Sequence, residues 1–144
     1  SWSSWECYSW CACMYLLWGN RSDGEILSLT IEYTKQREQF GQSLSKFQAL
    51  QHRMVDMFME TEYAKSFLIK VLATEDDNEK VKLTYGLKNQ ISKAGKQVGE
   101  EAVQLHGGMG VTEEMSIGHY LKRLMVIANI FGSADYYLSK YIEK

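Results

Sequence analysis

Two short segments of this sequence carry side chains that could hold a nucleotide, and the first is residues 37–41. Arg37, Gln39 and Phe40 supply a guanidinium, an amide and an aromatic ring, and Gln48 adds a second amide. Arginine binds phosphate through paired hydrogen bonds, and an aromatic face beside amides suits a purine. Taken alone, these residues are better explained by a structural role, with the arginine in solvent and the phenylalanine in the core, than by nucleotide binding. A binding role therefore needs support from elsewhere in the chain.

The second segment is rich in glycine. Gln104 is followed by Gly107, Gly108 and Gly110, so that three of the four residues 107–110 are glycines. Consecutive glycines allow backbone amides to face a diphosphate without obstruction by side chains. The alternative is a helix end, for which one glycine is enough. The excess over one glycine is what favours a binding role.

Helices must position both segments, because apolar residues recur at spacings of three and four along most of the chain. A serine followed three residues later by Glu or Gln can form a capping box, which predicts helix starts at Ser22 and Ser45. The predicted helices are 22–37, from 45 to about 73, from 77 or 78 to 106, from a cap at Thr112 to an interruption at Gly132, and 134–142.

These elements predict an all-α protein, an up-down four-helix bundle with a short C-terminal tail helix. The chain has 144 residues and no proline, so it can fold as one domain and nothing forbids continuous helix. Antiparallel helices with short connections place the Gly107 and Gly108 end of the third helix beside the start of the second. Both segments then lie at one end of the bundle, which brings the binding interpretation level with the structural one.

Composition argues against several classes of partner. The net charge is −2 and the basic residues are spread along the chain, so no nucleic-acid partner is expected. The longest apolar run, Cys11 to Trp18, is too short to cross a bilayer, so no membrane partner is expected. The three cysteines lie between Cys7 and Cys13 in no zinc-binding pattern, so no metal site is expected. A reducing, cytoplasmic location fits this cysteine use.

Residues 1–21 differ from the rest of the chain. All four tryptophans and all three cysteines lie in the first 18 residues. We therefore divide the chain into an atypical Trp- and Cys-rich leader, residues 1–21, and a helical bundle, residues 22–144. The leader is either unrelated to the bundle or the start of its first helix.

Three stretches together resemble the C-terminal helical domain of the acyl-CoA dehydrogenase family: Tyr33 to Gln48, Gln104 to Gly110 with Thr112, and Gly118 to Arg123. The resemblance covers about residues 24–144 and is greatest to bacterial members that work as two-subunit assemblies. It implies an FAD-dependent oxidoreductase of fatty acid metabolism that dehydrogenates acyl-CoA thioesters. It also implies a homodimer or higher oligomer and allows a companion acyl-CoA dehydrogenase subunit.

The resemblance assigns cofactor contacts to both segments. The arginine segment matches positions that contact the pyrophosphate and adenine half of FAD, usually the FAD held by the neighbouring subunit. The glycine-rich segment matches the part that lies against the adenosine diphosphate moiety. None of these residues performs chemistry. The implied FAD contacts are Arg37, Gln39, Phe40, Gln48, Gln104, Gly107 and Gly108.

No catalytic base is predicted. In the family reaction a carboxylate removes the α-proton while the β-hydrogen leaves as hydride to the flavin. Counting from Arg123, Gly132 occupies the usual position of that carboxylate, and the alternative position falls near Cys11. Asp135 is the nearest acid, but it fits an exposed carboxylate at the start of the tail helix better. The family's front domains are missing as well, so the chain is expected to be inactive alone.

Two histidines and one alternative function complete the sequence-based expectations. His106 and His119 have no carboxylate at helical spacing to orient them, so we interpret both as structural. The alternative function is a free-standing helical module for interaction or oligomerisation that kept the bundle and lost flavin binding.

Overall fold

The computed structural model describes residues 4–107, 116–129 and 132–143, with only the backbone described for 4–18, 20 and 116. Five helices dominate it, which confirms the all-α prediction. A short hairpin and a 3₁₀ turn join the first two helices. The elements are α1 (Ser4–Gln36), β1 (Glu38–Gln39), β2 (Gln42–Ser43), η1 (Leu44–Lys46), α2 (Gln48–Ala73), α3 (Asp77–His106), α4 (Ser116–Asn129) and α5 (Ala134–Glu143).

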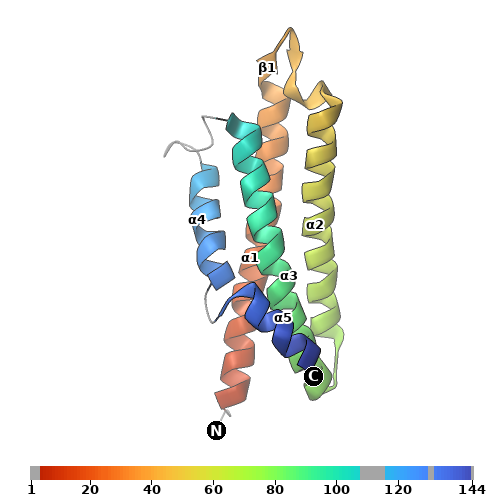
Figure 1. Ribbon diagram of the computed structural model, residues 1–144, viewed down its shortest axis with the longest axis vertical. Coiled ribbons are helices and arrows are strands. Elements are labelled where there is room, and N and C mark those ends of the chain that lie inside the picture. The colour runs from red at the N-terminus through yellow and green to blue at the C-terminus, as the bar shows by residue number, and fades with distance from the viewer. Residues whose placement is uncertain (1–3, 108–115, 130–131, 144) are drawn as a thin grey trace.

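The helix α3 is the centre of the bundle. It packs against α1, α2, α4 and α5, whereas the main packing contacts of α2 are with α1, α3 and η1. Figure 1 shows α1, α2 and α3 side by side with alternating directions, and α5 crossing near the end opposite the hairpin. The hairpin and the C-terminal end of α3 therefore lie at the same end of the molecule.

Two clusters of buried aliphatic side chains hold the helices together. Each buried Leu or Ile contributes about 1.5–3 kcal/mol relative to an exposed one. The cluster near the α2–α3 turn contains Ala64, Leu68, Val71, Leu83, Leu87, Ile91 and Ala94. The cluster nearer the hairpin contains Ile26, Leu27, Met57, Val98, Ala102, Leu105, Ile117 and Leu124.

Two of the predicted helix starts are wrong. Ser22 is buried in the middle of α1, because this helix begins at Ser4 and is continuous across the predicted division at residue 21. Ser45 lies in the 3₁₀ turn, where its hydroxyl pairs with that of Ser43 at 2.5 Å. Its carbonyl accepts from Gln51 Nε2 at 2.9 Å, and α2 begins only at Gln48.

The other boundaries fall within one or two residues of the predictions where they can be compared. Asp76 caps α3, one or two residues before the predicted cap at Asp77 or Asn78, and its carboxylate accepts from Glu79 N at 2.7 Å. The predicted cap at Thr112 lies outside the described residues. Within the described helices, none is both long and apolar enough to cross a membrane.

Candidate functional site

The hairpin after α1 presents an aromatic ring to solvent. Its strands pair antiparallel, and the two turn residues, Phe40 and Gly41, both have positive φ angles, of 53° and 79°. Turns of this kind match the twist of a hairpin but favour Asn-Gly. A left-handed conformation costs a residue such as Phe about 1–2 kcal/mol. The Phe40 side chain is 92% exposed, so its interpretation as a core phenylalanine is wrong.

Backbone and hydroxyl contacts hold this hairpin on the end of α1. Leu44 N donates to Arg37 O at 2.8 Å, which closes the base of the hairpin. Ser43 Oγ donates to Thr34 O at 3.3 Å, in the last turn of α1. The strain at Phe40 therefore sits in a loop with fixed ends, and such strained, exposed positions are common at functional sites.

A groove of about 430 Å³ separates the base of the hairpin from the end of α3. It brings together four of the seven residues predicted to contact FAD, namely Arg37, Gln39, Gln104 and Gly107. The remaining lining residues are Tyr33, Leu44, Leu50, Leu105 and His106. Phe40 and Gln48 lie outside the lining, and Gly108 lies outside the described residues. The lining thus combines a guanidinium and two amides with leucine and aromatic side chains, a set of groups suited to a phosphate attached to a flat ring system.

The role of Gly107 differs from the expected one. Its φ angle is 60°, and its N–H donates to Gln104 O, so its amide caps α3 and is not available to a diphosphate through that bond. A Cβ built at this position would meet nothing within 4 Å. Glycine is therefore needed here for the conformation that ends the helix. Arg37 is left as the cationic group of the groove lining.

His106 and Tyr33 join α1 to the end of α3. Their rings stack with centroids 4.2 Å apart, and Tyr33 OH donates to His106 O at 3.4 Å. His106 Nδ1 lies 2.8 Å from Ala102 O and Nε2 has no partner among the described residues. Burial lowers the pKa of His106, so the ring is neutral at pH 7. Sequence reasoning missed this pair; the available signal was that each residue lies in the last turn of its helix.

The position implied for the catalytic carboxylate has a backbone that favours glycine. Gly132 has a φ angle of 128°. A Cβ there would lie 3.1 Å from Tyr136 Cδ1 and 3.3 Å from Tyr137 Cε2. Any L side chain would be both strained and crowded. Asp135 is exposed in the first turn of α5, as expected for a helix N-terminal acid.

Polar side chains of α3 fix the segment around Gly132. Lys88 Nζ donates to Ile127 O, and Ser92 Oγ donates to Ala128 O at 3.4 Å, so both bind carbonyls at the end of α4. Asn89 Nδ2 donates to Ala134 O at 2.7 Å, at the start of α5. A cation at a helix C-terminus interacts favourably with the helix dipole. Burial lowers the pKa of Lys88 to about 8.

A buried acid, Asp23, was also missed because it was expected at a helix start. It is fully buried in α1 against α3 and α4, and neither carboxyl oxygen has a hydrogen-bond partner among the described residues. A Cβ built on Gly95 would lie 3.6 Å from Asp23 Oδ1 and 3.4 Å from Leu124 Cδ2. Burial raises the pKa of Asp23 to about 8, so this carboxyl is mostly protonated at pH 7.

Comparisons with known proteins agree with the helical bundle. The sequence pattern of the acyl-CoA dehydrogenase C-terminal domain matches residues 18–141. The acyl-CoA dehydrogenase IpdE2 of Mycolicibacterium smegmatis is 36% identical over 106 residues, which are 74% of this chain and 33% of that protein. The short-chain specific acyl-CoA dehydrogenase of Megasphaera elsdenii is 31% identical over 97 residues, 67% of this chain and 25% of that protein.

Solved structures share the same fold. Butyryl-CoA dehydrogenase from Megasphaera elsdenii matches with a TM-score of 0.85 and 25% identity, over 92% of this chain and 35% of that chain. PigA with FAD and proline matches with a TM-score of 0.88 and 22% identity, over 96% of this chain and 36% of that chain. The chain spans about a quarter to a third of the length of the curated relatives it matches. By the extent of the match to its C-terminal domain, this chain belongs to the acyl-CoA dehydrogenase family.

Proposed function

We propose that this chain is one domain of a protein that dehydrogenates acyl-CoA thioesters between the α and β carbons. The domain contributes to FAD binding and to subunit assembly. In this role the hairpin end binds the adenine and pyrophosphate half of FAD, and the bundle joins subunits. FAD, when bound, supplies the hydride acceptor of such a reaction. The chain alone does not catalyse it. The proposed setting is fatty acid metabolism in the cytoplasm, with further copies or a companion subunit as partners.

One observation carries this proposal, the convergence of the arginine and glycine segments on one groove. Arg37 provides the charge for a phosphate, and Gln39 and Gln104 provide amides that can donate and accept hydrogen bonds. Phe40 lies at the tip of the hairpin, outside this groove, and is exposed at a strained turn. A ring displayed in this way suits a cofactor held by a neighbouring subunit better than one held in its own groove.

The absence of a catalytic base at residue 132 supports the proposal that this chain alone has no dehydrogenase activity. The α-proton needs a carboxylate within reach, and Gly132 offers none. Its φ angle and the two neighbouring tyrosines oppose a simple exchange for an acid. Proton abstraction in the whole protein is therefore assigned to a carboxylate elsewhere.

The test is a thermal unfolding series with FAD, on the chain alone and mixed with a full-length relative. Ligand at 100 times its dissociation constant should stabilise the folded state by about 2.7 kcal/mol. Arg37→Gln should remove this response. Lys96→Gln, which removes the same charge from an exposed site on α3, should keep it.

A second function is favoured if that series shows no response. The Gly107 amide is used within its own helix, which leaves the groove with less affinity for phosphate than the sequence predicts. The chain would then be a helical interaction module without flavin binding. A response that Arg37→Gln and Lys96→Gln both retain would place the nucleotide elsewhere on the bundle.

A further inference from the structure

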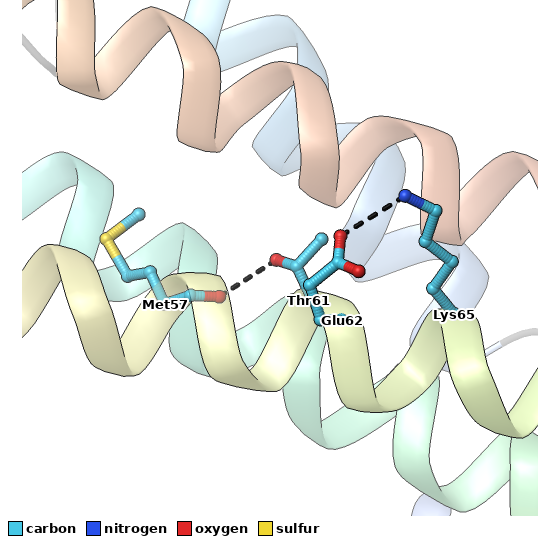
Figure 2. Close-up of polar contacts among 4 residues, drawn as sticks. All are labelled: Met57, Thr61, Glu62 and Lys65. Atoms are coloured by element: carbon cyan, nitrogen blue, oxygen red, sulfur yellow. Dashed lines mark hydrogen bonds and ion pairs between the residues drawn. The ribbon is translucent and has the colours of Figure 1, made fainter.

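Most buried polar side chains in the described part of the bundle have a hydrogen-bond partner. Figure 2 shows an example on α2, where the hydroxyl of the buried Thr61 donates to Met57 O at 2.9 Å, beside the ion pair of Glu62 and Lys65. His106, at the end of α3, is only 3% exposed, yet its Nε2 has no partner among the described residues. An unpaired buried polar atom lowers stability, so its presence needs an explanation.

The other described side chains with an unpaired buried polar atom, Asp23 and Glu101, do not line the groove at the hairpin end. Glu101 Oε2 lies 3.3 Å from Arg53 Nε in an ion pair. Asp23 lies in the core of the bundle, where burial raises its pKa to about 8 and keeps it mostly uncharged at pH 7. His106 lines the groove. It is therefore the unpaired group that a ligand in this groove can satisfy.

The hydrogen bond at the other ring nitrogen of His106 decides what Nε2 can do. His106 Nδ1 lies 2.8 Å from Ala102 O, and because a carbonyl oxygen only accepts, Nδ1 carries the proton of this bond. Burial lowers the pKa of His106, so the ring holds no second proton at pH 7. Nε2 therefore has a free lone pair in the plane of the ring and can only accept a hydrogen bond.

The ring that carries this acceptor is held in place from two sides. Tyr33 stacks on it with the ring centroids 4.2 Å apart and the planes 25° from parallel. Tyr33 OH also donates to His106 O at 3.4 Å, which ties the end of α3 to α1. Since Nδ1 is bound to Ala102 O as well, the ring cannot exchange its two nitrogens without losing that bond. Nε2 is thus an acceptor of fixed position and fixed character.

The other polar side chains of the groove lining are less selective. Arg37 only donates, and a phosphate satisfies it. The amides of Gln39 and Gln104 can rotate to present either their oxygen or their nitrogen, so they suit donors and acceptors equally. A fixed acceptor distinguishes the two. A purine with an amine at C6 offers Nε2 a donor, whereas a 6-oxopurine offers it a second acceptor at the same place.

We infer that His106 Nε2 accepts a hydrogen bond from the exocyclic amine of an adenine nucleotide bound in this groove, and that this contact selects adenine over 6-oxopurines. The phosphates of the nucleotide then lie at Arg37 and its base lies at the end of α3. The inference rests on the proposed function and names the residue that determines the base preference. A site built to hydrogen-bond one group of a ligand rejects the analogue without it, because a buried polar atom is left unpaired.

Titration calorimetry of the wild-type chain at pH 7.5 with three nucleotides tests the preference without any substitution. IDP has a carbonyl in place of the amine of ADP and keeps the ribose and both phosphates. ADP should bind about tenfold more tightly than IDP, the effect of one hydrogen bond of this kind. The third nucleotide, 2′-deoxy-ADP, keeps the amine and lacks one ribose hydroxyl. It should bind like ADP.

A matched pair of substitutions assigns the preference to His106. His106→Phe keeps an aromatic ring against Tyr33 and removes the acceptor, so the affinity for ADP should fall about tenfold, to that for IDP. His52→Phe makes the same change at an exposed histidine of α2 and should keep the preference for ADP. Circular dichroism of both variants separates a folding defect from a binding defect.

Nitrogen-15 NMR of the histidine rings gives a readout that a purely structural role would not move. The resonance of the unprotonated His106 Nε2 should shift when ADP is added, because its lone pair becomes hydrogen-bonded. IDP should leave it in place. The signal is assigned by its loss in His106→Phe. This measurement on the wild-type chain decides the question even where His106→Phe fails to fold.

Equal affinities of the wild-type chain for ADP and IDP would overturn the inference. An unchanged preference in folded His106→Phe, or a larger loss of affinity with 2′-deoxy-ADP than with IDP, would do the same. Equal affinities that Arg37→Gln abolishes would leave the groove assignment of the proposed function intact and remove only the base preference. No binding of any of the three nucleotides at about 1 mM would remove both.

Discussion

The helices α2 and α3 are adjacent and of similar length, yet they differ in how much of their surface is buried. Of the 30 residues of α3, 14 are buried, whereas only five of the 26 residues of α2 are buried. α3 contains three glycines where neighbours come close, and a Cβ on Gly86 would lie 2.8 Å from Phe67 Cζ. α2 contains no glycine. A central helix needs small residues on several sides, whereas an edge helix needs only one buried stripe.

The strongest test of this difference is truncation at the centre. Leu87 of α3 is fully buried in the cluster near the α2–α3 turn. Leu87→Ala should lower the free energy of unfolding by about 2–5 kcal/mol, because it removes buried contacts and leaves a cavity. Urea denaturation measures this loss. A loss below about 1 kcal/mol would contradict a central role for α3.

The buried acid that packs against α3 gives a prediction for pH. The pKa of Asp23 is raised from its ordinary value of 3.8 to about 8, so its contribution to stability is complete below pH 4 and lost as pH rises through 8. Between pH 6.5 and 8 the wild type should lose roughly 1.5 kcal/mol of unfolding free energy. Asp23→Asn should show no such slope.

This pH window separates Asp23 from the other buried titratable groups. His106, with a lowered pKa, affects stability only below about pH 6.5. Lys88, with its pKa lowered to about 8, adds stability as pH rises from 8 towards 10.5. Denaturation at several pH values measures the slope, and an equal slope in Asp23→Asn would assign the effect to another group.

Replacing Phe40 in the strained turn of the hairpin should stabilise the fold and weaken FAD binding. Phe40→Asn puts a residue that tolerates the left-handed backbone conformation in place of a phenylalanine that does not. It should therefore raise the free energy of unfolding by about 1 kcal/mol. It should also reduce the FAD response, because it removes the exposed ring. Gln42→Ala, in the same hairpin, is the control. A variant that is less stable than the wild type would show that Phe40 supports the fold.

The smallest effect is expected at Ile69, an exposed apolar residue of α2. Ile69→Ala at concentrations where the chain is monomeric should change the free energy of unfolding by less than about 0.5 kcal/mol, because this side chain is 61% exposed. A large loss would mean that Ile69 supports the fold of a single chain.

Helix identity and order could be predicted from the sequence because the apolar spacing of each helix agrees with its packing. In the helix predicted from 45 to about 73, residues at steps of three and four include Met57, Thr61, Ala64, Leu68 and Val71, and these five are buried. Two helix starts were wrong because capping boxes are local signals and tertiary packing overrides them. Ser22 and Asp23 are polar residues typical of a helix start, yet α1 carries both into the core.

The candidate site could be predicted only in part. Antiparallel topology was enough to bring Arg37 and Gly107 to one groove. The positive φ of Phe40 could not be predicted, because the turn uses Phe-Gly where Asn-Gly is usual. The contact of Tyr33 with His106 depends on the relative rotation of α1 and α3, which no spacing in the sequence specifies.

The backbone at Gly132 also limits which residues could replace it. A single codon change can place glutamate at residue 132, but the backbone there has a φ of 128° and two tyrosine rings beside it. Three α3 side chains hold the flanking carbonyls in place. An acid at this position would therefore require a different backbone between α4 and α5.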